Sequence, residues 1–179
     1  DYEALLHWWQ QENTKNRHLF PGINTVGIKN VVNKSKEISE QIKIDRALNA
    51  KDKGTIHWSI AGLSKNKEML ETIQNLYKEK ALPPASFWLK SENTVAPSLY
   101  TLTDGNKIKL NWQQKKSQNI AYWILNLKYD NQWETEILQA TTTTMLIESQ
   151  KNNKKLKAIA IRSVDRVGKE SPAEIRTLD

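Results

Sequence analysis

Cysteine is absent from this chain of 179 residues, and glycine and proline are scarce, at six and five residues. Without thiols the chain forms no disulfide and offers no thiolate for catalysis or for a zinc–cysteine site. The few glycines are scattered, so no glycine-rich loop is present to hold a phosphate. Apolar runs stay well below the roughly 18 residues of a membrane-spanning helix. The sequence therefore predicts no membrane span, and no signal peptide is visible at its start.

Metal-binding patterns are sparse as well. Three histidines are present, and His7 and His18 have no carboxylate or histidine at the spacing of metal ligands. We therefore expect no metal site and no cofactor. The chain begins at Asp1 inside a segment with a helical pattern, which favours its interpretation as part of a longer protein whose export signal would lie upstream.

Charge is distributed evenly along a chain of globular composition, 38% hydrophobic and 26% charged. The formal net charge is +7, with 14 Lys and Arg against 11 Asp and Glu in residues 1–95, and 13 against 9 in residues 96–179. The one basic cluster, residues 151–157, is rich in asparagine, which is typical of an exposed turn. We therefore expect no nucleic-acid partner. A nucleic-acid binder that uses this cluster is the alternative, and its binding would depend strongly on salt.

Helical and strand patterns alternate over the first half of the chain. The predicted elements are a helix over residues 2–13, a strand over 18–24, a helix over 35–48, a strand over 55–60 and a helix from about residue 66 to residue 77. This order is typical of parallel βα units. Two parallel strands form no stable sheet unaided, so we interpret this region as the end of a larger α/β barrel or sheet.

After Pro97 the hydrophobic pattern changes to a period of two. The predicted strands are 98–103, 107–113, 120–128, 133–140, 143–148, 157–164 and 173–178. Seven short strands separated by turns predict a β-sandwich. The residues expected to face its core are Ile108, Leu110 and Trp112, then Tyr122, Ile124 and Asn126 or their neighbours, then Ile159 and Ile161.

Residues 159–172 (IAIRSVDRVGKESP) resemble the F–G hairpin of the fibronectin type III modules of bacterial glycosidases. Trp112 and Tyr122 occupy the positions at which that family keeps its core aromatic residues. The resemblance covers nearly all of residues 96–179 and implies a seven-stranded fibronectin type III-like β-sandwich.

The first half resembles the C-terminal end of the glycosyl hydrolase-like 10 family. The matching stretches are 2–9 (YEALLHWW), 17–22 (RHLFPG), 37–42 (EISEQI), 57–59 (HWS), 76–77 (LY) and 81–88 (ALPPASFW). The resemblance implies that residues 1–92 are the last βα units of an incomplete (β/α)8 barrel, followed by the sandwich at 96–179. It also implies an enzyme of the bacterial cell envelope, periplasmic or extracellular, that hydrolyses glycan chains such as peptidoglycan.

Glycoside hydrolysis requires two carboxylates, which in a barrel lie at the C-terminal ends of strands. The two predicted strands end in Ile23-Asn24-Thr25 and Trp58-Ser59-Ile60, neither of which contains Asp or Glu. We therefore expect no catalytic residue in this chain. The residues predicted to contact a glycan substrate are Asn24, His57, Trp58, Ser59 and Trp88; for each of them core packing is the alternative.

The sequence thus predicts an α/β part followed by an all-β part, in a fragment of an envelope glycoside hydrolase that is not catalytic by itself. The alternative is a non-catalytic carbohydrate- or protein-binding envelope protein. Paired carboxylates at upstream strand ends would favour the enzyme. We also expect copies of the chain to associate through exposed edges of the partial barrel.

Overall fold

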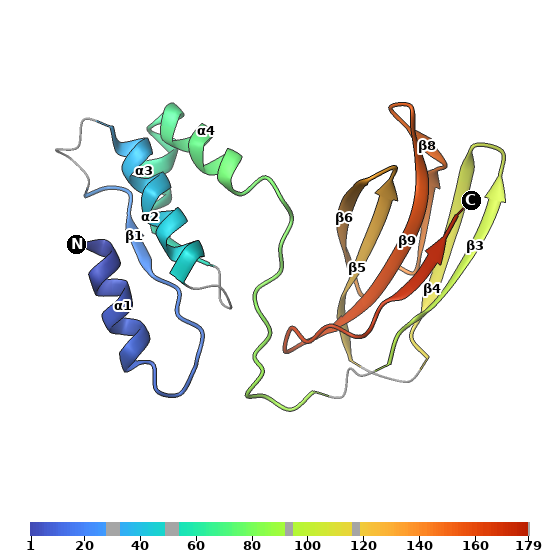
Figure 1. The fold of residues 1–179 in the computed structure, drawn as a ribbon, viewed down its shortest axis with the longest axis horizontal. Helices are drawn as coiled ribbons and strands as arrows, with labels where there is room; N and C mark the ends of the chain where they lie inside the picture. Colours follow the sequence, from blue (N-terminus) through green and yellow to red (C-terminus); the bar gives the residue numbers. More distant parts are fainter. Residues whose placement is uncertain (28–32, 49–53, 92–94, 116–118, 179) are drawn as a thin grey trace. The chain divides into compact units, whose positions relative to one another are not determined.

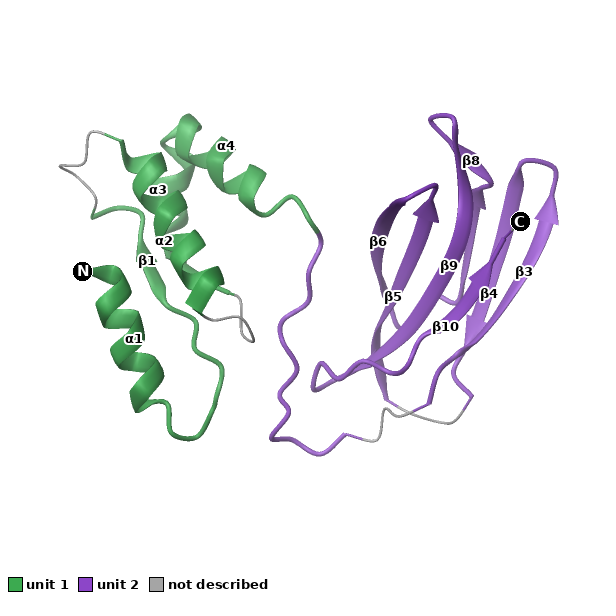
Figure 2. Ribbon diagram, viewed as in Figure 1, with its two compact units in different colours: residues 1–79 green, residues 80–179 purple. Residues whose placement is uncertain are grey.

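The computed structural model describes residues 1–27, 33–48, 54–91, 95–115 and 119–178. The chain divides into two compact units, Asp1–Glu79 and Lys80–Asp179 (Figure 2). Residues 80–91, which the sequence assigns to the first region, are grouped with the second. In the described part of the chain, no helix has both the length and the apolar character needed to cross a membrane.

The first unit packs its helices against two short strands (Figure 1). Its elements are α1 (Tyr2–Glu12), β1 (Gly22–Asn24), α2 (Lys34–Leu48), β2 (Ile56–Trp58), α3 (Ile60–Ser64) and α4 (Lys67–Leu76). Polar side chains cap three of the helices: the Asp1 carboxylate accepts from the Glu3 N–H (3.1 Å), the Asn33 side chain from the Lys36 N–H (2.9 Å) and the Asn66 side chain from the Met69 N–H (3.0 Å). Both strands are shorter than predicted: β1 begins only at Gly22, and β2 ends at Trp58 because Ile60 already begins a helix that the sequence pattern did not indicate.

Strands β1 and β2 pair in parallel, with Ile23 opposite His57. Ile23 is fully buried against Ile38 and Ile42 of α2 and Met69 of α4. The periodic apolar residues of the sequence thus form the core, and the helices close one face of the two-stranded sheet. The parallel βα arrangement agrees with the sequence interpretation; its membership in a larger barrel remains a proposal.

The second unit is an antiparallel sandwich. One sheet has the order β3 (Ser98–Asp104), β4 (Lys107–Gln113), β7 (Thr144–Glu148); the other has the order β10 (Glu174–Thr177), β9 (Lys154–Asp165), β5 (Ile120–Tyr129), β6 (Gln132–Gln139), with β8 (Gln150–Lys151) paired to β9. All seven predicted strands are present, and β8 is an additional short one. Three strands against four give a fibronectin type III-like β-sandwich, so this part of the predicted fold is confirmed.

The sandwich core contains the predicted inward residues of β4 and β9 and a different set from β5. Trp112 and Leu110 are buried, as expected. On β5 the inward residues are Trp123, Leu125 and Leu127, the neighbours of the first-named candidates. Trp123 is 3% exposed and its indole N–H donates to the Ala140 carbonyl (3.0 Å), whereas Tyr122 is only half-buried. The core aromatic of this strand is therefore Trp123 and not Tyr122.

Residues 80–91, here called the proline segment, are tied to the sandwich at several points. Lys80 pairs with Glu136 of β6, the Ser86 N–H donates to the Val167 carbonyl (2.8 Å), and Ser91 donates to Asp165. The same Asp165 side chain accepts from the Val167 and Lys169 N–H groups (2.9 Å each), which fixes the loop between β9 and β10. The segment is thus held at β6 and at this loop.

The substitution Leu110→Ala tests the sandwich core. Leu110 is fully buried, so replacement by alanine removes packing and leaves a cavity that costs about 2–5 kcal/mol. Leu102, in the neighbouring strand of the same sheet, is 65% exposed, and Leu102→Ala should cost less than about 0.5 kcal/mol. Denaturant unfolding of both variants, followed by tryptophan fluorescence, makes the comparison. Equal losses would contradict the described core.

The substitution Gly168→Ala tests the packing of the proline segment against the loop between β9 and β10. Gly168 has a φ of +83°, and a Cβ there would lie 3.0 Å from the Ala85 Cα. Gly105 also has a positive φ, +56°, but nothing lies within 4 Å of its would-be Cβ. Alanine should therefore cost about 1–2 kcal/mol at Gly105 and more at Gly168. Amide exchange at Ser86 should accelerate in Gly168→Ala alone; unchanged exchange would argue against this packing.

Candidate functional site

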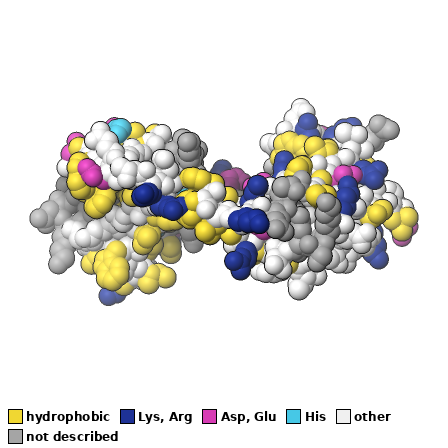
Figure 3. Space-filling view, turned by 90° about the horizontal axis from the view of Figure 1, so that it is seen from below, with side chains coloured by type: hydrophobic (Ala, Val, Ile, Leu, Met, Phe, Trp, Pro, Cys, Tyr) yellow, Lys and Arg dark blue, Asp and Glu magenta, His cyan; other side chains and the backbone are white. Residues whose placement is uncertain are grey.

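The face of the β1–β2 sheet that the helices leave uncovered is called here the open face, and it carries Gly22, Asn24, Ile56 and Trp58. Strand side chains alternate between faces, so burial of Ile23 places these four residues on the other side. Ile56 is 57% exposed and Trp58 is 72% exposed. Exposed hydrophobic side chains gather in patches on both units in the view of Figure 3. Large apolar side chains on one exposed sheet face indicate a contact surface.

Hydrogen bonds fix the carboxyl ends of both strands. Thr25, 4% exposed, donates its N–H to the Trp58 carbonyl (2.8 Å) and its hydroxyl to the Ser59 carbonyl (2.9 Å). The Asn24 side-chain oxygen accepts from the N–H groups of Val26 (3.2 Å) and Gly27 (2.6 Å). The structure thus brings Asn24, Trp58 and Ser59 together at one end of the sheet. Thr25 holds this arrangement through its two hydrogen bonds. The sequence analysis did not single it out as a site residue, although its position directly after a predicted strand indicated a place at this end of the sheet.

His57 lies on the opposite face from Trp58. Its Nε2 is 3.2 Å from the Thr55 hydroxyl, which is 2.6 Å from the Tyr77 hydroxyl, and its ring packs edge-on against Tyr77 (5.9 Å). Burial lowers the pKa of His57 below its usual value. The structure therefore separates His57 from Asn24 and Trp58, with which the sequence analysis had grouped it.

A second polar group lies on the helix side of the sheet. Arg46 of α2 donates to the Leu76 carbonyl at the end of α4 (2.8 Å), and its guanidinium lies 4.9 Å from the Tyr77 ring centre.

Burial and the nearby Asp45 raise the pKa of Tyr2 to about 12. Asp45 itself is 1% exposed, so this carboxylate belongs to the interior. The open face carries no carboxylate, and among the described residues no His, Asp and Glu side chains cluster in a way that could hold a metal ion.

Trp88 belongs to the proline segment of the second unit. Its ring packs edge-on against Phe87 (5.1 Å), which is 63% exposed. Its predicted contact with a glycan stays a prediction. Phe87 was not among the sequence candidates, although it adjoins one.

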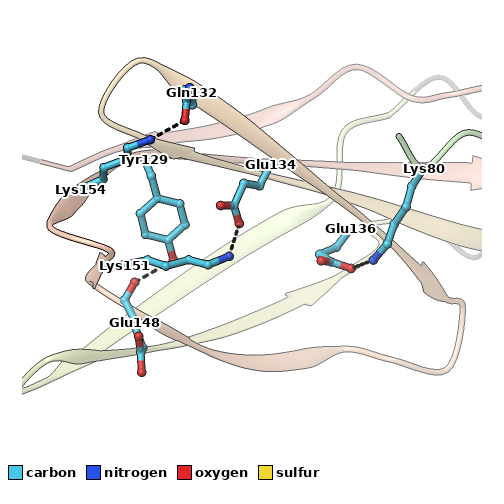
Figure 4. A network of polar contacts seen from close by, with 8 residues as sticks. All are labelled: Lys80, Tyr129, Gln132, Glu134, Glu136, Glu148, Lys151 and Lys154. Carbon is cyan, nitrogen blue, oxygen red and sulfur yellow. Dashed lines mark hydrogen bonds and ion pairs between the residues drawn. The ribbon is translucent and has the colours of Figure 1, made fainter. Parts of the chain in front are cut away.

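The basic cluster of residues 151–157 forms the hairpin between β8 and β9, whose Asn152 and Asn153 have φ of +50° and +62°. Figure 4 shows Lys151 paired with Glu134 (2.8 Å) and Lys154 hydrogen-bonded to Gln132 (2.6 Å). Glu134 and Gln132 both belong to β6. The hydrogen bond from Lys151 to Glu134 raises the lysine pKa. Two lysines of the cluster are thus engaged within the sandwich.

No protein-family model matches the chain, and no curated protein sequence matches it. Among solved structures, the Clostridium perfringens spore cortex lytic enzyme SleM is 23% identical over 48% of this chain and 28% of its own, with a TM-score of 0.37. Pectate lyase PelI from Erwinia chrysanthemi is 16% identical over 45% of this chain and 28% of its own (TM-score 0.36). An FN3 domain of human collagen XX is 13% identical over 55% of this chain and 100% of its own (TM-score 0.38). The chain thus spans little more than a quarter of the two enzymes.

His57 gives the first unit a defined pH response. Because burial lowers its pKa in the folded state, the unfolded chain binds a proton more readily as the pH falls below about 6.5. Stability should therefore be full above the unfolded pKa and should decline as the pH falls through the lowered folded pKa. His57→Gln should flatten this decline, whereas the same substitution at His7, an exposed residue of α1, should not. Thermal unfolding of the parent chain and both variants between pH 7.5 and 4.5 measures this decline. Identical stability profiles for the three proteins would contradict a lowered pKa of His57 in the folded state.

Proposed function

We propose that this chain is the C-terminal part of a bacterial envelope glycoside hydrolase, in which it contributes sugar-contacting residues and no catalytic carboxylate. One observation carries the proposal. Asn24 and Trp58 are exposed on adjacent parallel strands, at their carboxyl ends, on the face opposite the helices. In a (β/α)8 barrel that face is the interior and that end holds the active site.

Trp58 is the main sugar-contacting residue in this proposal. An indole that is 72% exposed presents a flat apolar surface, which suits the C–H face of a pyranose ring. Ser59 adjoins it and would line the same subsite, together with Asn24. His57 would act from the opposite face through its contacts with Thr55 and Tyr77, and Trp88 would be a separate sugar contact on the second unit.

Catalysis would depend on residues outside this sequence. Hydrolysis of a glycosidic bond needs an acid and a second carboxylate, and the ends of β1 and β2 provide neither. Additional strands would complete the barrel around the open face, leave Trp58 at its substrate-binding end and supply both groups. This chain by itself should therefore bind glycans without cleaving them, with peptidoglycan as the proposed substrate class.

The second candidate is a non-catalytic carbohydrate- or protein-binding envelope protein. The absence of Asp and Glu from the open face favours it, because this surface is equipped for contact and not for acid–base chemistry. In either case the exposed apolar surface of Ile56, Trp58 and Ile60 favours association between copies of this chain.

Hydrolysis of denuded peptidoglycan by this chain and by the full-length protein tests the proposal. The full-length protein should cleave and this chain should not. In the full-length protein, Trp58→Ala should remove a stacking contact of about 0.5–1.5 kcal/mol, which lowers kcat/KM up to about tenfold. Trp8→Ala, a 49% exposed tryptophan on α1, is the matched control. Binding without cleavage by both proteins would favour the second candidate. No glycan binding by either would refute the hydrolase and a carbohydrate-binding role, and would leave only the protein-binding form of the second candidate.

A further inference from the structure

A groove of about 570 Å³ lies on the sandwich between the proline segment and the outer face of β5, β6 and β9. Its size is within the range of roughly 300–1,000 Å³ that is common for small-molecule sites. The lining consists of residues from both sides: Lys80, Ala81, Leu82, Pro83, Pro84, Ala85, Ile124, Asn126, Thr135, Ile137, Arg162, Gly168, Lys169 and Glu170. All of them belong to the second unit, so the groove is independent of the open face.

A row of hydrogen-bonded side chains crosses this groove. Arg162 donates through Nη1 to the Asn126 side-chain oxygen (3.0 Å), and the Asn126 amide donates to the Thr135 hydroxyl (2.9 Å). Arg162 Nε lies 3.8 Å from a carboxylate oxygen of Glu170. Three neighbouring strands and the loop after β9 thus supply one continuous polar row, called here the Asn126–Arg162 ladder.

The ladder is fixed before any ligand arrives. Asn126 and Thr135 stand opposite each other in the β5–β6 register, and both are half-buried. A β-bridge between Val164 and Glu170 holds the glutamate beside the strand. Because each side chain is oriented by its neighbour, a ligand that binds here would not have to order them, which reduces the entropic cost of binding.

Charge pairing in the groove favours a neutral ligand. Of the three cationic side chains that line the groove, Arg162 is paired with Glu170 and Lys80 with Glu136, as Figure 4 shows for the lysine; the third is Lys169. A guanidinium carries five N–H donors, of which the ladder uses only part, and the Glu170 carboxylate is an acceptor. Donors and acceptors side by side suit hydroxyl groups, which both donate and accept.

Apolar surface flanks the polar row. Ile124, Ile137, Pro83 and Pro84 line the groove with C–H groups. Trp133 stands two residues before Thr135 on β6, so its side chain shares the outer face, and its ring is 51% exposed. Pyranose sugars combine hydroxyl edges with C–H faces, and this surface offers a partner for each.

We propose that the Asn126–Arg162 ladder is the floor of a glycan-binding site that takes a neutral pyranose oligosaccharide. The site is distinct from the barrel-type subsite around Trp58 and does not require it. The sandwich would thereby hold a polysaccharide strand by itself.

Calorimetric titration of the full chain with chitotetraose and cellotetraose, and with polygalacturonate as an anionic comparison, tests this site. Asn126→Ala and Arg162→Lys should each weaken binding of a neutral oligosaccharide by about tenfold, the equivalent of a lost hydrogen bond to a charged group. Arg162→Lys keeps the charge and removes the planar fork. Binding should change little between low and high salt.

Arg176→Lys, in β10 outside the groove, and Trp8→Ala, on α1, are the controls and should bind as the parent chain does. Trp58→Ala is measured beside them to separate this site from the proposed subsite around Trp58. Near-UV circular dichroism verifies that each variant is folded. Loss of binding in Trp58→Ala but not in the ladder variants would overturn this site and leave the proposed function standing. Binding of polygalacturonate alone, equal loss in Arg176→Lys, or no binding of either neutral oligosaccharide would also overturn it.

Discussion

Side chains of a β-strand alternate between two faces, and this constraint decides what each sheet of this protein buries and what it exposes. In the first unit it sends Ile23 into the helical core and Trp58 out to solvent, on neighbouring strands only three residues long. In the second it sends Trp123, Leu125 and Leu127 into the sandwich, and it leaves Asn126 on the outer face. Both proposed glycan-contacting surfaces are therefore consequences of what the opposite faces bury.

The two units differ in how completely they cover the apolar faces of their sheets. The sandwich closes its apolar surfaces between two sheets, as an antiparallel fold of three and four strands can do by itself. The first unit has helices over one face only, and the other face keeps Ile56 and Trp58 exposed. Exposed apolar surface of this kind is the physical reason for proposing that further strands surround it and complete a site.

Polar contacts of long sequence separation organise the surface of the sandwich. Arg162 and Asn126 are far apart along the chain but lie on adjacent strands, and Lys80 reaches Glu136 from the start of the proline segment. Exposed ion pairs such as Lys80–Glu136 contribute little to stability. Their effect here is positional, because the segment and the sheet they connect form the two sides of one groove.

What the sequence determined by itself is the type and order of most elements, because helical and alternating hydrophobic patterns are local. Residues 34–48 and the seven sandwich strands follow from such patterns. Where both faces of a strand carry apolar residues, only the tertiary structure decided which face is buried. On β5 the sequence favoured Tyr122 as the core aromatic residue, whereas pairing with β9 and packing in the sandwich turn its neighbour Trp123 inward. The tertiary structure likewise placed His57 against Tyr77, fixed Thr25 to the end of β2, and joined Asn126 to Arg162, because contacts between distant segments leave no periodic trace in the sequence.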